Sequence, residues 1–557
     1  MPTVSDIVAT TLAAYDTKHF FCMMGGDHDL WMSLHDANIR LINCRSESGA
    51  VYMADGYARV TGKPGFVYGQ RGPGVSNVAG ALADALWASS PVISLTSSIA
   101  MSSRDRFEYQ ELDGLPLHAG VTRWNKTVSS PDRAAAMLRA AIRIATGTPP
   151  GPVHLEIPAD MFRAEADAGD AYRENNVGHV NDRRVVPITR EVAHTVDLLL
   201  QAERPLIVAG GGVIMSEAWD ALTALADALS IPVATTLGGK GAIDAAHDLA
   251  VGVIGRNSSK VGNDAVREAD MILAIGTRLG GLATHRWTLP FGEKRLIQID
   301  SDPQIIGHNY PTELGVIGDA KLVLETALAI VDERKLRSPR TDWAKDIAKR
   351  VATWRGHAAA LAEQKPNDGI HPADVIARLR EVMAPEDLIA ADTGAHGGWV
   401  GALFPVKAGR SMVRANGSLG WVFPGAMGAA LASPQRRTVA VSGDGGMLYH
   451  IAEFETALRC DIPIVAVVLN NASLASERHT QESRYKRVIT EVCDYRDVDF
   501  AAVARAFGAH GTRVEDRADL RDAVRDALKA NVPALVDVRV SRDAHSPSAN
   551  NDKTRLV

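Results

Sequence analysis

The stretch SGDGGMLYHIAEFETALRCDIPIVAVVLNNAS, residues 442–473, decides the fold of this chain. An apolar segment runs into a glycine turn, a helical stretch follows, and a second apolar segment ends at the pair NN. Strand, helix and strand in this order predict one βαβ unit of a parallel sheet. Open parallel sheets bind ligands beyond the carboxyl ends of their strands, so Asp444 and Asn471, 27 residues apart, are expected on that edge.

The residue types at this edge are those that hold a magnesium ion. Asp444 offers a carboxylate, Asn471 an amide oxygen and Ser473 a backbone carbonyl, and Mg²⁺ prefers such ligands together with phosphate oxygens. A glycine turn alone is most often only structural, but the two motifs at this spacing favour a site for a diphosphate. The glycines that let the backbone approach the anion are Gly443, Gly445 and Gly446.

Composition and charge exclude several classes of protein. The chain has 557 residues, of which 46% are hydrophobic and 23% charged, an ordinary balance for about three globular domains. A net charge of −6 without a basic run argues against nucleic acid, and no apolar run approaches the roughly 18 residues of a membrane span. A signal peptide is not recognisable and no CxxC pair occurs, so we expect a reducing, cytoplasmic location.

Short apolar strands alternate with glycine turns and alanine-rich helices in three regions of the chain. The regions span residues 1–165, 186–335 and 370–540, with polar linkers between them. Such alternation predicts an α/β fold of three doubly wound parallel-sheet domains. The first and third regions have a similar pattern, which suggests related folds. The polar segment 541–557 is expected to be a C-terminal tail or a lid over the site.

The GDG segment, the spacer and the NN pair together resemble the signature of thiamine-diphosphate (ThDP)-dependent enzymes. Along essentially its whole length the chain resembles the acetolactate synthase-like branch of that superfamily. The resemblance implies, in chain order, a pyrimidine-binding domain, a middle Rossmann-like domain and a diphosphate-binding domain. It also implies ThDP and Mg²⁺ as cofactors, and a homodimer or homotetramer with active sites at subunit interfaces. The first and third regions are then not expected to meet within one chain.

The resemblance assigns the activating glutamate to Glu47, in the segment RSESGAVYMADGYAR. In the family this carboxyl group contacts the aminopyrimidine ring and helps to deprotonate the cofactor. Without the resemblance, Glu47 is simply an acidic residue at a helix N-terminus. Asp55 is the competing carboxylate, but it lies within the helix and is better explained as structural. The loop RGPGVSN places Gly72 and Asn77 at the pyrimidine, and carries Arg71 where the family often has a small hydroxyl residue.

The segments NGSLGWVFPG and DTGAH resemble further cofactor contacts of the family. Leu419 would be the apolar side chain that bends the cofactor, and Gly417 would offer a carbonyl to the pyrimidine amine. Gly394 and His396 would contact the diphosphate. The alternatives are an ordinary core leucine and a satisfied surface histidine.

Substrate contacts are expected in three segments, GGDHDL, FEYQELD and SLASERHTQES. In acetolactate synthases the last segment carries a methionine and a tryptophan, where this chain has Ser476 and Thr480. That difference argues against an ordinary acetolactate synthase and favours a polar or anionic acceptor. The candidate substrate residues are Asp27, His28, Tyr109, Gln110, Ser476, Glu477 and Thr480.

The resemblance implies an enzyme that makes or breaks a C–C bond next to a carbonyl through an enamine (acyl-anion) intermediate, with a 2-oxo acid donor. Alternatives are a 2-hydroxyacyl-CoA lyase giving an aldehyde or ketone plus formyl-CoA, and acyl transfer like that of sulfoacetaldehyde acetyltransferase. A non-catalytic scaffold would not need to keep Glu47, Asp444 and Asn471. RLGGLATHRW stands where acetolactate synthases hold FAD, which argues against a flavin. A nucleotide or coenzyme A in the middle domain stays an alternative.

Overall fold

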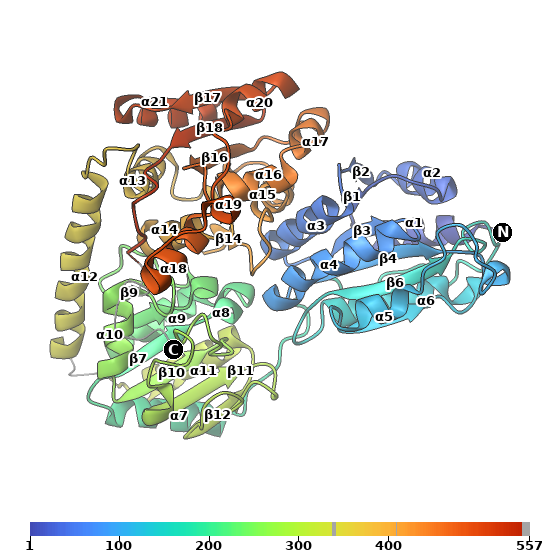
Figure 1. The fold of residues 1–557 in the computed structure, drawn as a ribbon. Coiled ribbons are helices and arrows are strands. Elements are labelled where there is room, and N and C mark those ends of the chain that lie inside the picture. Colours follow the sequence, from blue (N-terminus) through green and yellow to red (C-terminus); the bar gives the residue numbers. More distant parts are fainter. Residues whose placement is uncertain (337–340, 408, 548–557) are drawn as a thin grey trace.

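A computed structural model describes residues 1–336, 341–407 and 409–547. Over these ranges the chain forms three sheets of six strands each, and the paired strands run parallel. Helices flank each sheet (Figure 1). The predicted fold class, three doubly wound α/β domains, is confirmed. The domain limits read from the sequence stay a prediction, and residues 548–557 of the expected tail lie outside the described residues.

The first sheet has the order β2-β1-β3-β4-β6-β5. Its central strands β3 and β4 are buried along their whole length, as parallel strands covered on both faces should be. The strands are β1 (His19–Cys22), β2 (Arg40–Asn43), β3 (Gly65–Gly69), β4 (Val92–Ser98), β5 (Trp124–Thr127) and β6 (Val153–Pro158). The helices are α1 (Val4–Ala14), α2 (His28–Asp36), α3 (Glu47–Thr61), α4 (Pro73–Ala88), α5 (Gly114–Ala119) and α6 (Ala134–Ala145).

The middle sheet has the order β12-β11-β10-β7-β8-β9. Its strands are β7 (Pro205–Ala209), β8 (Val233–Thr235), β9 (Ala250–Val253), β10 (Met271–Ile275), β11 (Arg295–Asp300) and β12 (Leu314–Ile317). The helices are α7 (Thr189–Gln201), α8 (Gly211–Met215), α9 (Trp219–Leu229), α10 (Lys260–Glu268) and α11 (Ala320–Glu333), and the long helix α12 (Thr341–Ala362) follows along one side of the molecule (Figure 1).

The third sheet has the order β14-β13-β15-β16-β18-β17, the same order as the first when its strands are counted in sequence. The strands are β13 (Leu388–Ala391), β14 (Met412–Arg414), β15 (Thr438–Gly443), β16 (Val465–Asn470), β17 (His510–Val514) and β18 (Ala534–Arg539). The helices are α13 (Pro372–Val382), α14 (Ala395–Leu403), α15 (Val422–Ala432), α16 (Asp444–His450), α17 (Glu453–Arg459), α18 (Ala475–Tyr485), α19 (Thr490–Cys493), α20 (Phe500–Phe507) and α21 (Arg517–Lys529). The βαβ unit expected over residues 442–473 is present as β15, α16, α17 and β16.

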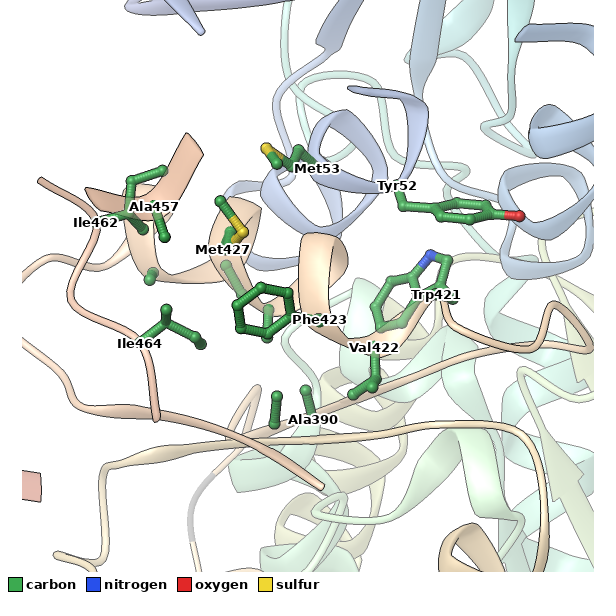
Figure 2. Packing of buried hydrophobic residues seen from close by; sticks show 14 of the residues in the cluster. Tyr52, Met53, Ala390, Trp421, Val422, Phe423, Met427, Ala457, Ile462 and Ile464 are labelled. Carbon is green, nitrogen blue, oxygen red and sulfur yellow. The ribbon is translucent and has the colours of Figure 1, made fainter. Parts of the chain in front are cut away.

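The first and third domains meet within the chain, which corrects the expectation that they would not. Helix α3 packs along α15, and one apolar core joins the two domains. Figure 2 shows Tyr52 and Met53 of α3 beside Trp421, which directly precedes α15, and beside Phe423 and Met427 of α15. The resemblance implies a cofactor between the first domain of one subunit and the third domain of its partner. A separate contact between the first and third domains of the same chain is compatible with that arrangement.

Two glycines let these helices approach at backbone distance. A Cβ atom added to Gly56 of α3 would lie 1.9 Å from the carbonyl oxygen of Gly425. A Cβ atom added to Gly428 of α15 would lie 1.9 Å from the carbonyl oxygen of Met53. No larger residue fits at either position without moving backbone.

A membrane-crossing helix is not found in the described parts of the chain, because none of their helices is both long and apolar enough. The four cysteines, all described, are buried and free.

Candidate active site

Asp444 and Asn471 come together at the carboxyl edge of the third sheet. Asp444 directly follows β15, Asn471 directly follows the neighbouring strand β16, and the two strands pair in parallel. One carboxylate oxygen of Asp444, Oδ1, accepts the backbone N–H of Gly445 at 2.7 Å. The other, Oδ2, accepts the backbone N–H groups of Asn471 and Ser473, each at 3.1 Å. The loop after β16 is therefore folded around the Asp444 carboxylate.

The Asp444 carboxyl group is buried, with 4% of the residue exposed, and burial raises its pKa to about 6. Backbone N–H groups are the partners that lower this pKa. A buried carboxylate of this kind is stabilised by a cation, and a carboxylate, an amide and a carbonyl form the oxygen set that Mg²⁺ binds. The Ser473 hydroxyl donates to Asp494 Oδ1 at 2.8 Å, and the backbone carbonyl of Ser473 accepts the N–H of Ala475 at 2.9 Å, which leaves its second lone pair for a metal. The residues at this edge fit a magnesium ion.

His396, in the first turn of α14, lies against the same glycine turns. A Cβ atom on Gly394 would be 2.7 Å from its ring, and one on Gly443 would be 2.8 Å away. Burial lowers the pKa of His396 to about 4. Within the described residues its buried Nε2 atom has no hydrogen-bond partner. The ring packs against two turns that leave no room for a side chain, and its Nε2 atom, which lacks a partner, fits an oxygen of a bound diphosphate.

The turn that carries Leu419 lies between β14 and α15. Leu419 is partly exposed rather than in a core, and Gly417 has φ +149° with open space where a side chain would be. Asp84 of the first domain accepts the backbone N–H groups of Asn416 and Ser418 at 3.0 Å. The first domain of the same chain therefore holds this turn in place.

Asp84 belongs to a buried ionic network that the sequence reasoning missed. Arg59 forms ion pairs with both Asp55 and Asp84, whose side chains are 0% exposed. Asp55 also accepts the indole N–H of Trp421 at 2.8 Å. The spacing Asp55-Arg59, one helical turn apart on α3, was the available signal. Asp55, the alternative to Glu47 as the activating carboxylate, thus takes part in the contact between the two domains.

A second missed residue is Asp392, directly after β13. It accepts the backbone N–H of Gly420 at 2.9 Å and that of Thr393 at 2.9 Å. Burial raises the pKa of Asp392 to about 7. In the segment DTGAH only Gly394 and His396 were predicted as contacts, although the aspartate at the strand end was also a visible signal.

Glu47 begins α3 at the carboxyl edge of the first sheet. Its Oε2 atom accepts the side-chain N–H of Asn77 at 3.1 Å. A Cβ atom on Gly74 would lie 3.2 Å from its Oε1 atom. The structure thus brings Glu47 together with the RGPGVSN loop, as the expected pyrimidine end requires.

His450 links the Glu47 segment to the Leu419 turn. Its Nε2 atom bonds the hydroxyl of Ser48 at 3.1 Å, and its Nδ1 atom bonds the carbonyl oxygen of Gly420 at 3.1 Å. Because a carbonyl can only accept, Nδ1 carries the proton. Burial lowers the pKa of His450 to about 4, so the ring is neutral at neutral pH. The sequence offered no signal for this bridge, because it joins residues 402 positions apart.

The substrate candidates of the first domain divide into two groups. Asp27 accepts the hydroxyl of Tyr68 and lies 4.0 Å from the Arg71 guanidinium, so Arg71 reaches a neighbouring carboxylate. Gln110, whose own backbone φ is +64°, lies beside Gly72. His28 and Tyr109 are exposed, Tyr109 to 77%, and neither side chain forms a hydrogen bond or ion pair with a described residue that would bring it to this cluster.

Helix α18 holds the candidates that follow Asn471. The Thr480 hydroxyl donates to the carbonyl of Ser476 one turn earlier, at 2.8 Å, and is exposed. Glu477 is also exposed, and its charge raises the pKa of Arg256 in the middle domain, although burial lowers it more. The helix thus extends from the Asn471 edge towards the middle domain.

A cavity of ≈ 540 Å³ lies where all three domains meet. Glycine turns of the middle domain line it, together with Arg278, Asp300, Trp87 and Arg410. Burial raises the pKa of Asp300 to about 6. The size of the cavity and its glycine-rich wall suit a nucleotide-sized ligand. A nucleotide or coenzyme A was the alternative expectation for the middle domain.

Comparisons with known proteins agree with this arrangement. Three family models match in order: the N-terminal TPP binding domain of thiamine pyrophosphate enzymes over residues 2–117, the central domain over 192–327 and the C-terminal TPP binding domain over 392–538. A probable acetolactate synthase large subunit of Methanocaldococcus jannaschii is 31% identical, covering 96% of this chain and 91% of its own. An acetolactate synthase large subunit of Parasynechococcus marenigrum is 30% identical over 90% and 81%. A sulfoacetaldehyde acetyltransferase of Castellaniella defragrans is 30% identical over 98% and 94%.

Proposed function

We propose, from the premise that this chain belongs to the thiamine pyrophosphate enzyme family, that it uses ThDP and Mg²⁺ to make or break a C–C bond next to the carbonyl of a small 2-oxo acid. The observation that carries the proposal is the edge where the loop after β16 folds around Asp444. The relatives named as acetolactate synthases support the 2-oxo acid as donor. When bound, ThDP supplies an electron sink for a carbanion at the former carbonyl carbon.

The third domain would hold the charged end of the cofactor. Asp444, Asn471 and the Ser473 carbonyl would ligate Mg²⁺, and Gly443 and Gly394 would let backbone N–H groups approach the diphosphate. His396 would offer its free ring nitrogen to the same anion. These groups lie within five residues of the ends of β13, β15 and β16, so little ordering would be needed on binding.

Glu47 would handle the proton. It lies at the start of α3 with one carboxylate oxygen bonded to Asn77, which fixes its orientation and leaves the other oxygen to face a ligand. Such a positioned carboxyl group can pass a proton to and from a pyrimidine ring.

We also propose that the active unit is a homodimer or homotetramer whose sites lie between the first domain of one subunit and the third domain of its partner. Mixing two inactive variants tests this. Subunits with Glu47→Gln and subunits with Asp444→Ala would form mixed dimers with one site carrying both defects and one intact. Activity regained on mixing supports sites between subunits, and none regained would place each site within one chain.

A second candidate reaction is acyl transfer. It is favoured by the sulfoacetaldehyde acetyltransferase match and by Ser476 and Thr480, which make α18 polar where acetolactate synthases carry a methionine and a tryptophan. The central cavity supports a third candidate reaction, that of a 2-hydroxyacyl-CoA lyase.

Incubation with ThDP, Mg²⁺ and one donor substrate at a time, each with and without inorganic phosphate as an acyl acceptor, separates these reactions. The panel contains pyruvate and longer 2-oxo acids, sulfoacetaldehyde, and 2-hydroxyacyl-CoAs, with products identified by mass spectrometry. Consumption of a 2-oxo acid with release of CO₂ and a carboligation product supports the main proposal. Turnover of only sulfoacetaldehyde or only acyl-CoA would replace it by the corresponding alternative.

A further inference from the structure

Helix α18 and the C-terminal tail bring together three groups that can ligate a metal. The tail over residues 541–547 follows β18 and returns to α18, where His545 meets His479 and Glu482. One ligand atom from each of the three lies within 4.8 Å of the other two. His479 and Glu482 are three residues apart and so share one face of the helix. The His545 Nε2 atom lies 3.8 Å from Glu482 Oε2, and the two imidazole rings stack with centroids 3.8 Å apart.

We propose that His479, Glu482 and His545 form a binding site for a divalent transition metal ion of the zinc type, separate from the Asp444 edge. Two imidazoles and one carboxylate are a common zinc ligand set that leaves a fourth position for water. Imidazole nitrogen selects zinc, cobalt or nickel over magnesium, which prefers oxygen. The Mg²⁺ of the active site therefore does not compete for this position.

The surroundings of the cluster prepare the histidines for a metal. The Nε2 atom of His479 bonds the carbonyl oxygen of Arg542 at 3.0 Å, so this nitrogen must be the donor. Histidine ligands commonly donate their second ring N–H to a carbonyl in this way, which orients the ring. The stacked rings need only turn apart to admit an ion.

An ion at this position would tie the tail to the edge that carries Asn471. The Arg542 side chain donates from Nε to the carbonyl oxygen of Asn471 at 3.1 Å, and its Nη1 atom lies 3.6 Å from Asp494 Oδ2. Asp494 in turn bonds the hydroxyl of Ser473 and pairs with Arg478 of α18. Fixing the tail at His545 therefore fixes Arg542 against the loop of the proposed Mg²⁺ ligands.

Cobalt titration of the ThDP- and Mg²⁺-saturated enzyme tests the site directly. Tetrahedral Co²⁺ absorbs visible light, and Zn²⁺ added afterwards displaces it and removes the band. We expect one Co²⁺ per chain. We expect His545→Gln and Glu482→Gln each to raise the Kd for Co²⁺ on the order of 10–100-fold or more. Even the loss of an outer hydrogen-bond partner of a metal ligand has an effect of that size. The matched control is His308→Gln, an exposed histidine of the middle domain, which should leave the Kd unchanged.

Three results would overturn the proposal. They are no stoichiometric Co²⁺ binding to the wild-type enzyme, an unchanged Kd in both His545→Gln and His479→Gln, and binding that is lost in Asp444→Ala but kept in His545→Gln. The last result would place the ion at the Asp444 edge. Because the readout is metal affinity rather than turnover, failure here leaves the proposed reaction untouched, and failure of that reaction leaves this site testable.

Discussion

The first and third domains have the same strand order but carry different chemistry at the same edge. The strand equivalent to β15 is β3, and the strand equivalent to β16 is β4. Asp444 follows β15 and Asn471 follows β16, whereas Gln70 follows β3 and Ile99 follows β4. An amide and an isoleucine do not make a magnesium site.

The two domains also use their second strand differently. After β2 only three residues precede α3, which begins with Glu47, whereas after β14 a turn of seven residues carrying Leu419 precedes α15. The helices themselves are equivalent and pack against each other. The common strand order therefore fixes the positions, and the residues just beyond each strand differ between the two domains in the roles that we propose for them.

The largest effect is expected from removing Asp444, the metal ligand that we propose for the third domain. Asp444→Ala should abolish Mg²⁺-dependent ThDP binding, measured by isothermal titration with and without Mg²⁺. The matched control is Gln70→Ala, at the equivalent position of the first domain, which should keep the dependence on Mg²⁺. Asp444→Asn keeps the shape of the side chain and guards against a variant that fails to fold. Unchanged ThDP affinity in both Asp444 variants would refute the metal assignment.

Glu47→Gln should leave ThDP affinity unchanged and slow exchange of the cofactor C2 proton about 10²–10⁴-fold, the usual contribution of a positioned acid–base group. Exchange is followed by NMR in deuterated buffer. Glu165→Gln, an exposed carboxylate that follows the first sheet, is the control and should exchange at the wild-type rate. A wild-type rate in Glu47→Gln would remove this residue from the chemistry.

Arg59→Met tests the network that joins the two domains. It leaves Asp55 and Asp84 buried without their cation, which should lower the free energy of unfolding by about 3–5 kcal/mol. Denaturant unfolding followed by tryptophan fluorescence measures the change, since Trp421 bonds Asp55. The control Arg143→Met breaks a half-exposed pair with Glu174 and should cost no more than about 1 kcal/mol. Equal losses in the two variants would contradict the role of the buried network.

Asp392 predicts a pH dependence that the first domain lacks, because Met23 follows the equivalent strand β1. The folded pKa of Asp392 is raised from 3.8 to about 7, so the folded chain keeps a proton that the unfolded chain has lost. Its contribution to stability is complete below pH 3.8 and is lost as the pH rises to about 7. Relative to the wild type, Asp392→Asn should gain stability across this window by a few kcal/mol, on the order of 1.4 kcal/mol per pKa unit. Denaturant midpoints at several pH values measure it, and a constant difference would count against the shift.

The smallest effect concerns the glycines between α3 and α15. Gly56→Ala and Gly428→Ala should each lower the free energy of unfolding by about 1–3 kcal/mol, because the new methyl group meets backbone of the other helix. Gly80→Ala in α4 meets nothing within 4 Å and should stabilise by up to about 1 kcal/mol through helix propensity. Thermal melts rank the stabilities of the three variants. Equal shifts in melting temperature would mean that α3 and α15 can accommodate the added methyl groups at this contact.

The sequence by itself determined the α/β class, the βαβ unit over residues 442–473 and the pairing of Asp444 with Asn471. These follow from local rules: strand and helix periodicity, glycine turns, and the fact that parallel strands end at one edge. The tertiary structure alone decided the contact between α3 and α15, the network around Arg59 and the bridge made by His450. It also decided the return of the tail to α18, which places His545 beside His479. Such contacts join side chains far apart along the chain, and their partners depend on how whole domains dock, which no local pattern encodes.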